Sequence, residues 1–252
     1  VSRHVKDVWT APVEVATGVQ ADGTRHPCWN PVLFEMTDRS LSLFYKVGPD
    51  PRNWWGMVRA SKDAGQTWSE ARRLPDGILG PIKNKPVRLA DGTIISPSSS
   101  ESNDKPSLWR IHFERSADNG STWTIARPPV VAGAPELQAI QPSILVYPGG
   151  RLQAVGRTRS ERVFQAWSED GGKTWGKEVF DVAVADGKTR PGMAIVSKLP
   201  NGKYMMVFEI VGVEGIPVHY KLSDDGVDWG DPADLGKKIH TKEGHFLRST
   251  PY

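Results

Sequence analysis

The sequence predicts an all-β protein, and three observations support this fold class. A short motif ending in tryptophan recurs at nearly constant spacing, apolar runs of strand length lie between its copies, and the chain of 252 residues holds 25 glycines and 10 tryptophans. Glycine is typical of tight turns and tryptophan of half-buried strands, and both are less favourable in long helices. We therefore expect many short strands joined by hairpins.

The recurring motif has the form S-x-D-x-G-x-T-W. It is complete at 61–68, 116–123 and 168–175, one residue shorter at 223–229, and worn at 2–9, where only its ends remain. Its aspartate can accept hydrogen bonds from the amides of its own loop, and its glycine can adopt a positive φ. Its tryptophan can pack back over the sheet that carries the turn. We interpret each copy as a structural hairpin turn. The structural residues are Asp63, Trp68, Asp118, Trp123, Asp170, Trp175, Asp225 and Trp229.

The chain between successive motifs also follows a pattern. An apolar strand opens at an x-Pro step such as Asn30-Pro31 or Gln141-Pro142, and a turn such as Asp91-Gly92 leads to a second apolar strand. Proline is tolerated at the start of a strand because it cannot donate to the ladder, and Asp-Gly is a hairpin signal. A third strand leads into the motif and a fourth leaves it, so each unit of about 50 residues holds four strands.

Four-stranded units repeated at this interval predict a β-propeller, here a single domain over residues 1–252. We expect about five four-stranded blades, and a six-bladed propeller that lacks a blade is the alternative. Residues 1–22 and 241–252 are expected to share one blade, which would close the ring and remove free sheet edges. The full blades are expected at 23–80, 81–132, 133–185 and 186–240.

Composition argues against several classes of partner and cofactor. A net charge of +3 with scattered basic residues does not predict nucleic-acid binding, and nothing in the chain predicts a membrane span. A Cys/His cluster and a glycine-rich phosphate loop are both missing from the sequence, so we expect no metal and no cofactor. The single cysteine, Cys28, cannot form an intramolecular disulfide and is expected to be a buried thiol. The start at Val1 is expected to reflect a mature or trimmed form.

In a propeller, the ligand site lies at one end of the central channel, on the loops that enter the innermost strands and leave the second strands. Basic side chains dominate these loops, and a positive concave site attracts an anionic ligand. Arginine can bind a carboxylate through two parallel hydrogen bonds, and a tryptophan can stack on a sugar ring. The predicted ligand-binding residues are Lys46, Lys83, Lys85, Asn30, Gln141, Arg157, Arg159, Arg190, Arg248 and Trp29.

Two carboxylates and two histidines are candidates for catalysis at the same end. Glycoside hydrolysis uses a pair of carboxyl-type groups, or a tyrosine nucleophile with a carboxylate partner. Glu209, which follows an apolar strand, is the first candidate and Glu101 the second. His26 and His245 could act as acid or base. The structural alternatives are an ion pair for Glu209 and a hydrogen-bonded framework role for the histidines.

Nearly the whole chain resembles the sialidase-like superfamily of BNR or Asp-box repeat proteins. Segments 29–34, 43–48 and 80–86 are similar to bacterial BNR-repeat sialidase-family proteins, whereas 190–193, 199–209 and 245–252 are closer to the exo-arabinanase-like branch. The resemblance implies a glycoside hydrolase that acts on the terminus of an anionic glycan and holds its carboxylate through arginine and lysine. It also implies a secreted or periplasmic location. The family's N-terminal Arg-Ile-Pro segment and the loop carrying its acid aspartate have no match here.

Two other functions remain open at this point. A polysaccharide lyase for uronate-containing glycans could use His26, His245 and the arginines. A non-catalytic glycan-binding propeller, or an engineered one, would need no catalytic carboxylate. We expect a carbohydrate partner for a hydrolase, a lyase or a lectin. We also expect a monomer unless another chain completes the ring.

Overall fold

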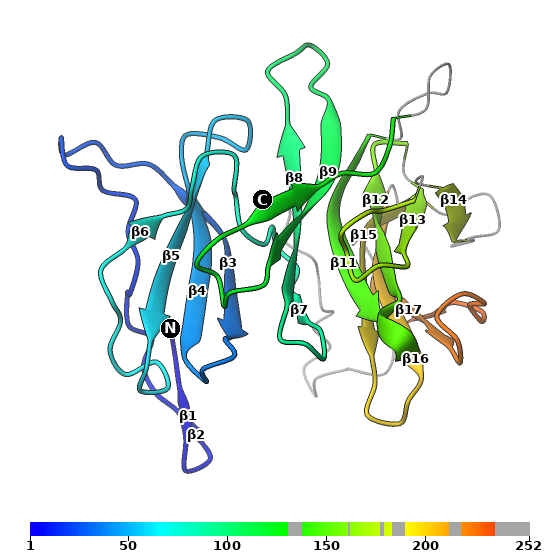
Figure 1. The fold of residues 1–252 in the computed structure, drawn as a ribbon, viewed down its shortest axis with the longest axis horizontal. Coiled ribbons are helices and arrows are strands. Elements are labelled where there is room, and N and C mark those ends of the chain that lie inside the picture. Colours follow the sequence, from blue (N-terminus) through cyan, green and yellow to red (C-terminus); the bar gives the residue numbers. More distant parts are fainter. Residues whose placement is uncertain (131–137, 161, 177–178, 183–189, 212–217, 235–252) are drawn as a thin grey trace.

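The computed structural model describes residues 1–130, 138–160, 162–176, 179–182, 190–211 and 218–234. Apart from one 3-10 turn at Pro148–Gly150, all regular structure in these residues is β-strand. Four antiparallel sheets of four strands each stand side by side in chain order, with a small hairpin before the first (Figure 1). The all-β class is therefore confirmed.

Each sheet uses four strands that are consecutive in the sequence. The hairpin pairs β1 (His4–Val5) with β2 (Val8–Trp9), and the first sheet has the order β3 (Cys28–Glu35), β4 (Leu41–Val47), β5 (Trp55–Ser61) and β6 (Arg72–Arg73). The second sheet holds β7 (Val87–Arg88), β8 (Ile94–Glu101), β9 (Trp109–Ser116) and β10 (Thr124–Ala126). The third holds β11 (Ala139–Val146), β12 (Leu152–Thr158), β13 (Val163–Ser168) and β14 (Val179–Val182). The fourth holds β15 (Arg190–Lys198), β16 (Tyr204–Val211), β17 (Val218–Ser223) and β18 (Ala233–Asp234).

The S-x-D-x-G-x-T-W segments are hairpin turns between the third and fourth strands, as the motif predicts. In the second copy, Asp118 Oδ1 accepts hydrogen bonds from the Ser116 hydroxyl and the Thr122 amide, each at 2.8 Å, and Oδ2 accepts the Thr122 hydroxyl at 2.6 Å. Gly120 adopts a φ of +84°. The bonds from Thr122 lower the pKa of Asp118 to about 2, because they stabilise the ionised carboxylate.

Trp123 and Trp175 pack across the boundary between sheets, which differs from the expected packing over their own sheet, whereas Trp68 packs against a buried cluster of its own sheet as expected. Trp175 of the third sheet stacks on Phe113 of the second, with ring centroids 3.6 Å apart. Trp123 of the second sheet makes an edge contact with Phe44 of the first at 6.3 Å. The turn glycine allows this approach: a Cβ on Gly172 would lie 2.9 Å from Ile95 of the second sheet. These two turns thus join the second sheet to the first and the third sheet to the second.

Two of the x-Pro steps differ from the prediction, because they lie inside the innermost strands β3 and β11, whereas Lys85-Pro86 precedes β7 and Arg190-Pro191 opens β15. In β3 the pairing register shifts between Trp29 and Val32, and in β11 it shifts between Ile140 and Ser143. The residues before proline, Asn30 and Gln141, have φ values of +45° and +55°. These are β-bulges, which tolerate proline and change the direction of nearby side chains.

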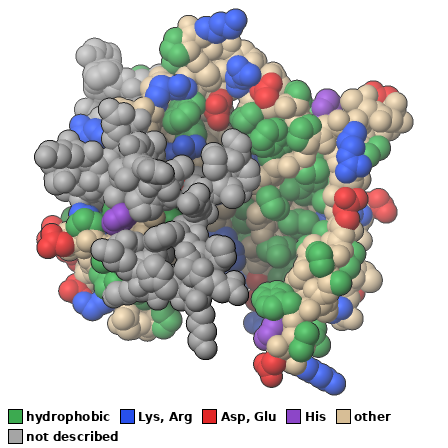
Figure 2. All heavy atoms as spheres, turned by 180° about the vertical axis from the view of Figure 1, so that it is seen from behind, with side chains coloured by type: hydrophobic (Ala, Val, Ile, Leu, Met, Phe, Trp, Pro, Cys, Tyr) green, Lys and Arg blue, Asp and Glu red, His purple; other side chains and the backbone are tan. Residues whose placement is uncertain are grey.

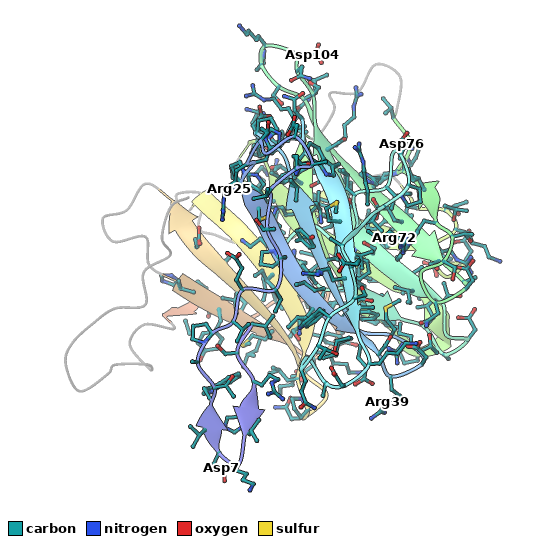
Figure 3. The ribbon with its side chains drawn as sticks, turned by 90° about the vertical axis from the view of Figure 1, so that its left-hand side faces the viewer. Asp7, Arg25, Arg39, Arg72, Asp76 and Asp104 are labelled. Atoms are coloured by element: carbon teal, nitrogen blue, oxygen red, sulfur yellow. The ribbon has the colours of Figure 1, made fainter. Side chains whose placement is uncertain are left out.

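The N-terminal segment runs along the first sheet. Val15 and Ala16 pack against a buried cluster of that sheet, and a Cβ on Gly65 would approach Arg3 at 3.8 Å. Figure 3 shows Asp7 at the tip of the β1–β2 hairpin, at the end of the molecule opposite to Asp104. Residues 241–252, predicted to share a blade with 1–22, lie outside the described residues.

The remaining surface gives one correction and one negative finding. Cys28 is exposed, contrary to the expected buried thiol, because it opens β3 at the rim of the sheet. Hydrophobic side chains gather along a hollow on the face seen in Figure 2. In the part of the chain that the structure describes, no helix is long and apolar enough to cross a membrane.

Candidate functional site

The loops that leave the second strands lie at one end of the molecule. In Figure 3, Arg25 and Asp104 mark this end. Arg39 lies toward the other end, in a turn between the first two strands of a sheet. Two of these loops touch, since the amide of Asn53 bonds the side chain of Asn103. The predicted site residues on the second strands therefore belong to the end marked by Arg25 and Asp104.

Arg157 is the centre of the candidate site. It lies near the end of β12, and its guanidinium is 5.2 Å from the centroid of the Trp109 ring. Arg159 contacts the same ring at 4.3 Å, and the Trp109 indole donates a hydrogen bond to Glu101 at 3.2 Å. Trp109 thus holds two predicted arginines and one predicted carboxylate together. The Nε atom of Arg157 is buried and has no hydrogen-bond partner among the described residues.

Lys83 lies beside Arg157. Both line a narrow gap together with Asn84, Gln141 and Ala194, which is too tight in this conformation to admit a water molecule. The Nζ atom of Lys83 is likewise buried and unpartnered within the described residues. Within the described residues, these two neighbouring cations thus each have a donor without an acceptor, a situation that usually indicates a bound ligand or water.

The electrostatics reflect this crowding of positive charge. Burial and the positive charge of Arg157 lower the pKa of Lys83 to about 8, and the negative charge of Glu209 opposes the shift. Burial also lowers the pKa of Arg157, and both Glu101 and Glu209 oppose that shift. The structure thus brings four predicted residues into one electrostatic group: Lys83, Glu101, Arg157 and Glu209. The two carboxylates offset part of the repulsion between the two cations.

Gln141 and Asn84 form the wall between the second and third sheets. The Asn84 amide donates to the backbone oxygens of Gln141 and Pro142, at 2.8 and 3.1 Å. The side-chain oxygen of Gln141 is buried and unpartnered in the described structure, so it can accept a hydrogen bond from a ligand hydroxyl or amide. Asn84 thus supports the backbone on which Gln141 is carried.

Aromatic side chains lie on the first sheet at the same end. The Trp29 indole donates to the Gly48 oxygen at 2.9 Å, and its ring meets Trp54 edge to face at 6.1 Å. The His26 ring meets Trp55 edge to face at 5.5 Å. Trp29 and His26 are therefore held within the first sheet and its loops, where an aromatic surface could face a ligand.

Lys46 is not a free cation at the mouth. Its side chain is fully buried, and its Nζ donates to the Pro81 oxygen at 2.7 Å. Burial lowers the pKa of Lys46 to about 7, with Glu114 opposing the shift. The sequence position indicated a basic residue at the channel, but the side chain turns into the boundary between the first and second sheets.

The other predicted residues do not join the group around Lys83 and Arg157 in the described structure. Lys85 is exposed, Asn30 forms the bulge in β3, and Arg190 lies in β15 with its side chain outside the described part. His245 and Arg248 lie outside the described residues. Among the described residues, no group of His, Cys, Asp and Glu could hold a metal ion.

Trp109 was missed because its pattern fits ordinary strand packing. The usable signal is its place across the β8–β9 hairpin, where it pairs with Glu101 in register. A tryptophan directly opposite a predicted site carboxylate could have been assigned to the site.

Comparison with known families now identifies the fold lineage. The model of the BNR repeat-like domain matches residues 1–211. The chain belongs to this BNR repeat-like family. This BNR-repeat chain is 27% identical over 155 residues to the anhydrosialidase of Macrobdella decora, covering 56% of this chain and 19% of that relative. The predicted sialidase-like BNR superfamily is thereby confirmed, while the exo-arabinanase-like affinity of the last third stays a prediction.

Solved structures show the same propeller fold. The Hadza microbial sialidase Hz136 superposes with a TM-score of 0.67 at 20% identity, over 93% of this chain and 51% of that one. A Dyadobacter fermentans protein of unknown function gives 0.69 at 16% identity, over 90% and 69%. A Trypanosoma rangeli sialidase in complex with sialic acid gives 0.56 at 16% identity, over 87% and 40%. This chain thus spans about half of the Hadza sialidase and 19% of the Macrobdella decora anhydrosialidase.

Proposed function

We propose that this BNR-repeat chain binds the carboxylate of a terminal acidic sugar at Lys83 and Arg157 and acts as a sialidase-like glycoside hydrolase. The observation that carries the proposal is the pair of adjacent buried cations whose Nζ and Nε atoms have no partner in the described structure. A carboxylate would accept from both once the two side chains separate to admit it, and such charge-assisted bonds are strong in a desolvated site.

Glu209 and Glu101 would supply the two carboxyl groups that glycoside hydrolysis requires. Both act electrostatically on Arg157, and Glu209 also acts on Lys83, so both lie near the proposed carboxylate position. Glu209 is proposed as the catalytic carboxylate. Glu101, whose carboxylate accepts a hydrogen bond from the Trp109 indole, is proposed as its partner. The names of the relatives, an anhydrosialidase and sialidases, support sialic acid as the first sugar to test.

The test is release of a fluorescent alcohol from an aryl sialoside by the whole chain. We expect Glu209→Gln to abolish turnover and to leave the melting temperature within about 1 °C of wild type, because a neutral amide of the same shape replaces the carboxylate. Glu70→Gln is the matched control: Glu70 is exposed and lies outside the site, so this variant should retain full activity.

Three results would contradict the hydrolase proposal. Full activity in Glu209→Gln would remove Glu209 from the mechanism. An ultraviolet absorbance rise on uronate polymers, without aryl sialoside cleavage, would favour a lyase. Sialic acid binding by the wild type without turnover of any aryl glycoside would favour a lectin.

A further inference from the structure

The segment Leu79–Asn84 carries Lys83 to the candidate site and is unusually well anchored. It links the first sheet to the second and does not form a strand of its own. The Ile82 amide bonds the Pro97 oxygen at 3.0 Å, and Lys83 has a φ of +69°. A left-handed conformation at a lysine is strained, so the surrounding contacts must hold it in place.

Buried side chains from the two adjoining sheets supply these contacts. The Glu114 carboxylate accepts the amides of Leu79 and Gly80 at 2.7 and 2.8 Å. The Ser98 hydroxyl donates to the Gly80 oxygen at 3.1 Å, and the Lys46 ammonium donates to the Pro81 oxygen at 2.7 Å. Three consecutive residues before the site are therefore fixed by three polar side chains.

Burying charged side chains between two sheets costs free energy, so these groups are a poor means of stabilising the fold. Glu114 and Lys46 both have 0% relative exposure. His112 supports Glu114 through a contact of 3.2 Å between its Nε2 and Glu114 Oε1. Apolar residues in place of buried ion clusters are often neutral or stabilising, so such clusters are weak evidence for a stabilising role. Their directed bonds to one loop indicate a role in fixing its conformation.

We propose that Glu114, Lys46 and Ser98 are positioning residues that clamp Leu79–Asn84 and thereby hold the Lys83 ammonium beside Arg157. This inference deepens the proposed function, since it explains how the anion site is built. Lys46 thus supports the site indirectly, through its hydrogen bond to the Pro81 backbone oxygen, and does not contact the ligand.

The chain offers a matched pair of serines for the test. Ser96 and Ser98 lie on β8, two residues apart and on the same face, and both have 0% relative exposure. The Ser98 hydroxyl bonds the clamped segment, whereas the Ser96 hydroxyl has no partner among the described residues. Ser98→Ala and Ser96→Ala remove the same atom from the same environment. Only Ser98→Ala removes a clamp bond.

The first measurement follows the titration of Lys83 itself, by mass spectrometry of its peptide after brief amine labelling at a series of pH values. We expect a wild-type midpoint near the pKa of about 8 and the same midpoint in Ser96→Ala. In Ser98→Ala, and more strongly in Lys46→Met, the midpoint should rise toward the ordinary value of 10.5, because the released ammonium reaches water.

The second measurement is calorimetric titration with free sialic acid at pH 6.5. Lys46→Met should weaken binding by about tenfold, the equivalent of one lost charge-assisted bond, and Ser96→Ala should bind as wild type does. Unchanged Lys83 midpoints in folded Ser98→Ala and Lys46→Met would overturn the clamp. A wild type that binds no sialic acid would overturn the proposed function, and the Lys83 midpoints would still decide the clamp without any ligand.

Discussion

Two residues, Lys83 and Arg157, carry most of the functional argument. Each is a cation largely removed from water, and each lies next to the other, which lowers the pKa of Lys83 to about 8. Burial and like charge both disfavour the charged forms of such a pair, and Glu101 and Glu209 offset part of this cost. A ligand carboxylate bound at the two cations would offset more of it.

Binding of sialic acid should depend on pH through Lys83. The sugar carboxylate is ionised throughout the range considered, while Lys83 is charged below its pKa of about 8 and neutral above it. Affinity should therefore be high at pH 6 to 7 and fall as the pH rises through that value. Loss of one charged hydrogen bond corresponds to a decrease of about tenfold to a hundredfold.

Lys83→Met supplies the comparison for this pH profile, measured by calorimetric titration. Its affinity should be low and constant over the same pH range, because Arg157 alone stays charged throughout. A wild-type affinity that does not change between pH 6 and 10 would show that Lys83 does not bind the carboxylate.

Lys46 shows what a sequence can and cannot predict about a single residue. The pattern placed it near the end of a second strand, and β4 confirms that position. The direction of its side chain depends on the neighbouring sheet, whose loop offers the Pro81 oxygen as a partner. Glu114 was overlooked for the same reason, since its acceptor role requires a loop 34 and 35 residues away in sequence.

At the scale of single elements, the hairpin turns follow directly from local sequence. The shortened fourth copy keeps the essential bonds: Asp225 Oδ1 accepts the Ser223 hydroxyl and the amides of Val227 and Asp228. All partners lie within three residues of Asp225. For such local motifs the sequence contains nearly all the information required.

Asp225→Asn should lower the melting temperature by an amount on the order of 2 °C at pH 7. These hydrogen bonds hold the pKa of Asp225 below its ordinary value of 3.8, so the carboxylate stabilises the fold above that pH. The difference between wild type and variant should shrink as the pH falls below 3.8, where protonation removes the advantage.

Asp224→Asn is the control in the same calorimetric scans. Asp224 makes only an exposed ion pair with Lys203, and exposed pairs contribute little to stability. Equal shifts in the two variants would show that the turn bonds do not distinguish Asp225 from its neighbour.

At the scale of the whole molecule, the contacts between sheets hold the propeller together. The core between the second and third sheets includes Ile95, Phe113, Leu152, Phe164 and Trp175, all buried. Trp175 belongs to a turn of the third sheet but stacks on Phe113 of the second. Its loss would leave a cavity at the boundary and affect both sheets.

Trp175→Ala should reduce the free energy of unfolding by about 3 to 5 kcal/mol, the usual cost of truncating a buried aromatic side chain. Chemical denaturation followed by circular dichroism measures this change. Trp9→Ala is the control, since Trp9 in the β1–β2 hairpin is 67% exposed, and it should change the free energy by no more than about 0.5 kcal/mol. Similar losses in both variants would contradict the assigned role of the sheet boundary.

The sequence by itself determined the all-β class, the repeating four-strand unit and the Asp-x-Gly turns, because these depend on residues a few positions apart. It also predicted Lys83, Glu101, Arg157 and Glu209 as site residues, since the repeat puts them at corresponding loops. Only the tertiary structure decided which charges meet and which are buried. The direction of the Lys46 side chain, the contact of Trp109 with both arginines and the stacking of Trp175 on the preceding sheet all depend on surfaces far apart in the chain. Local propensity sets the elements, but burial and charge are properties of the assembled sheets.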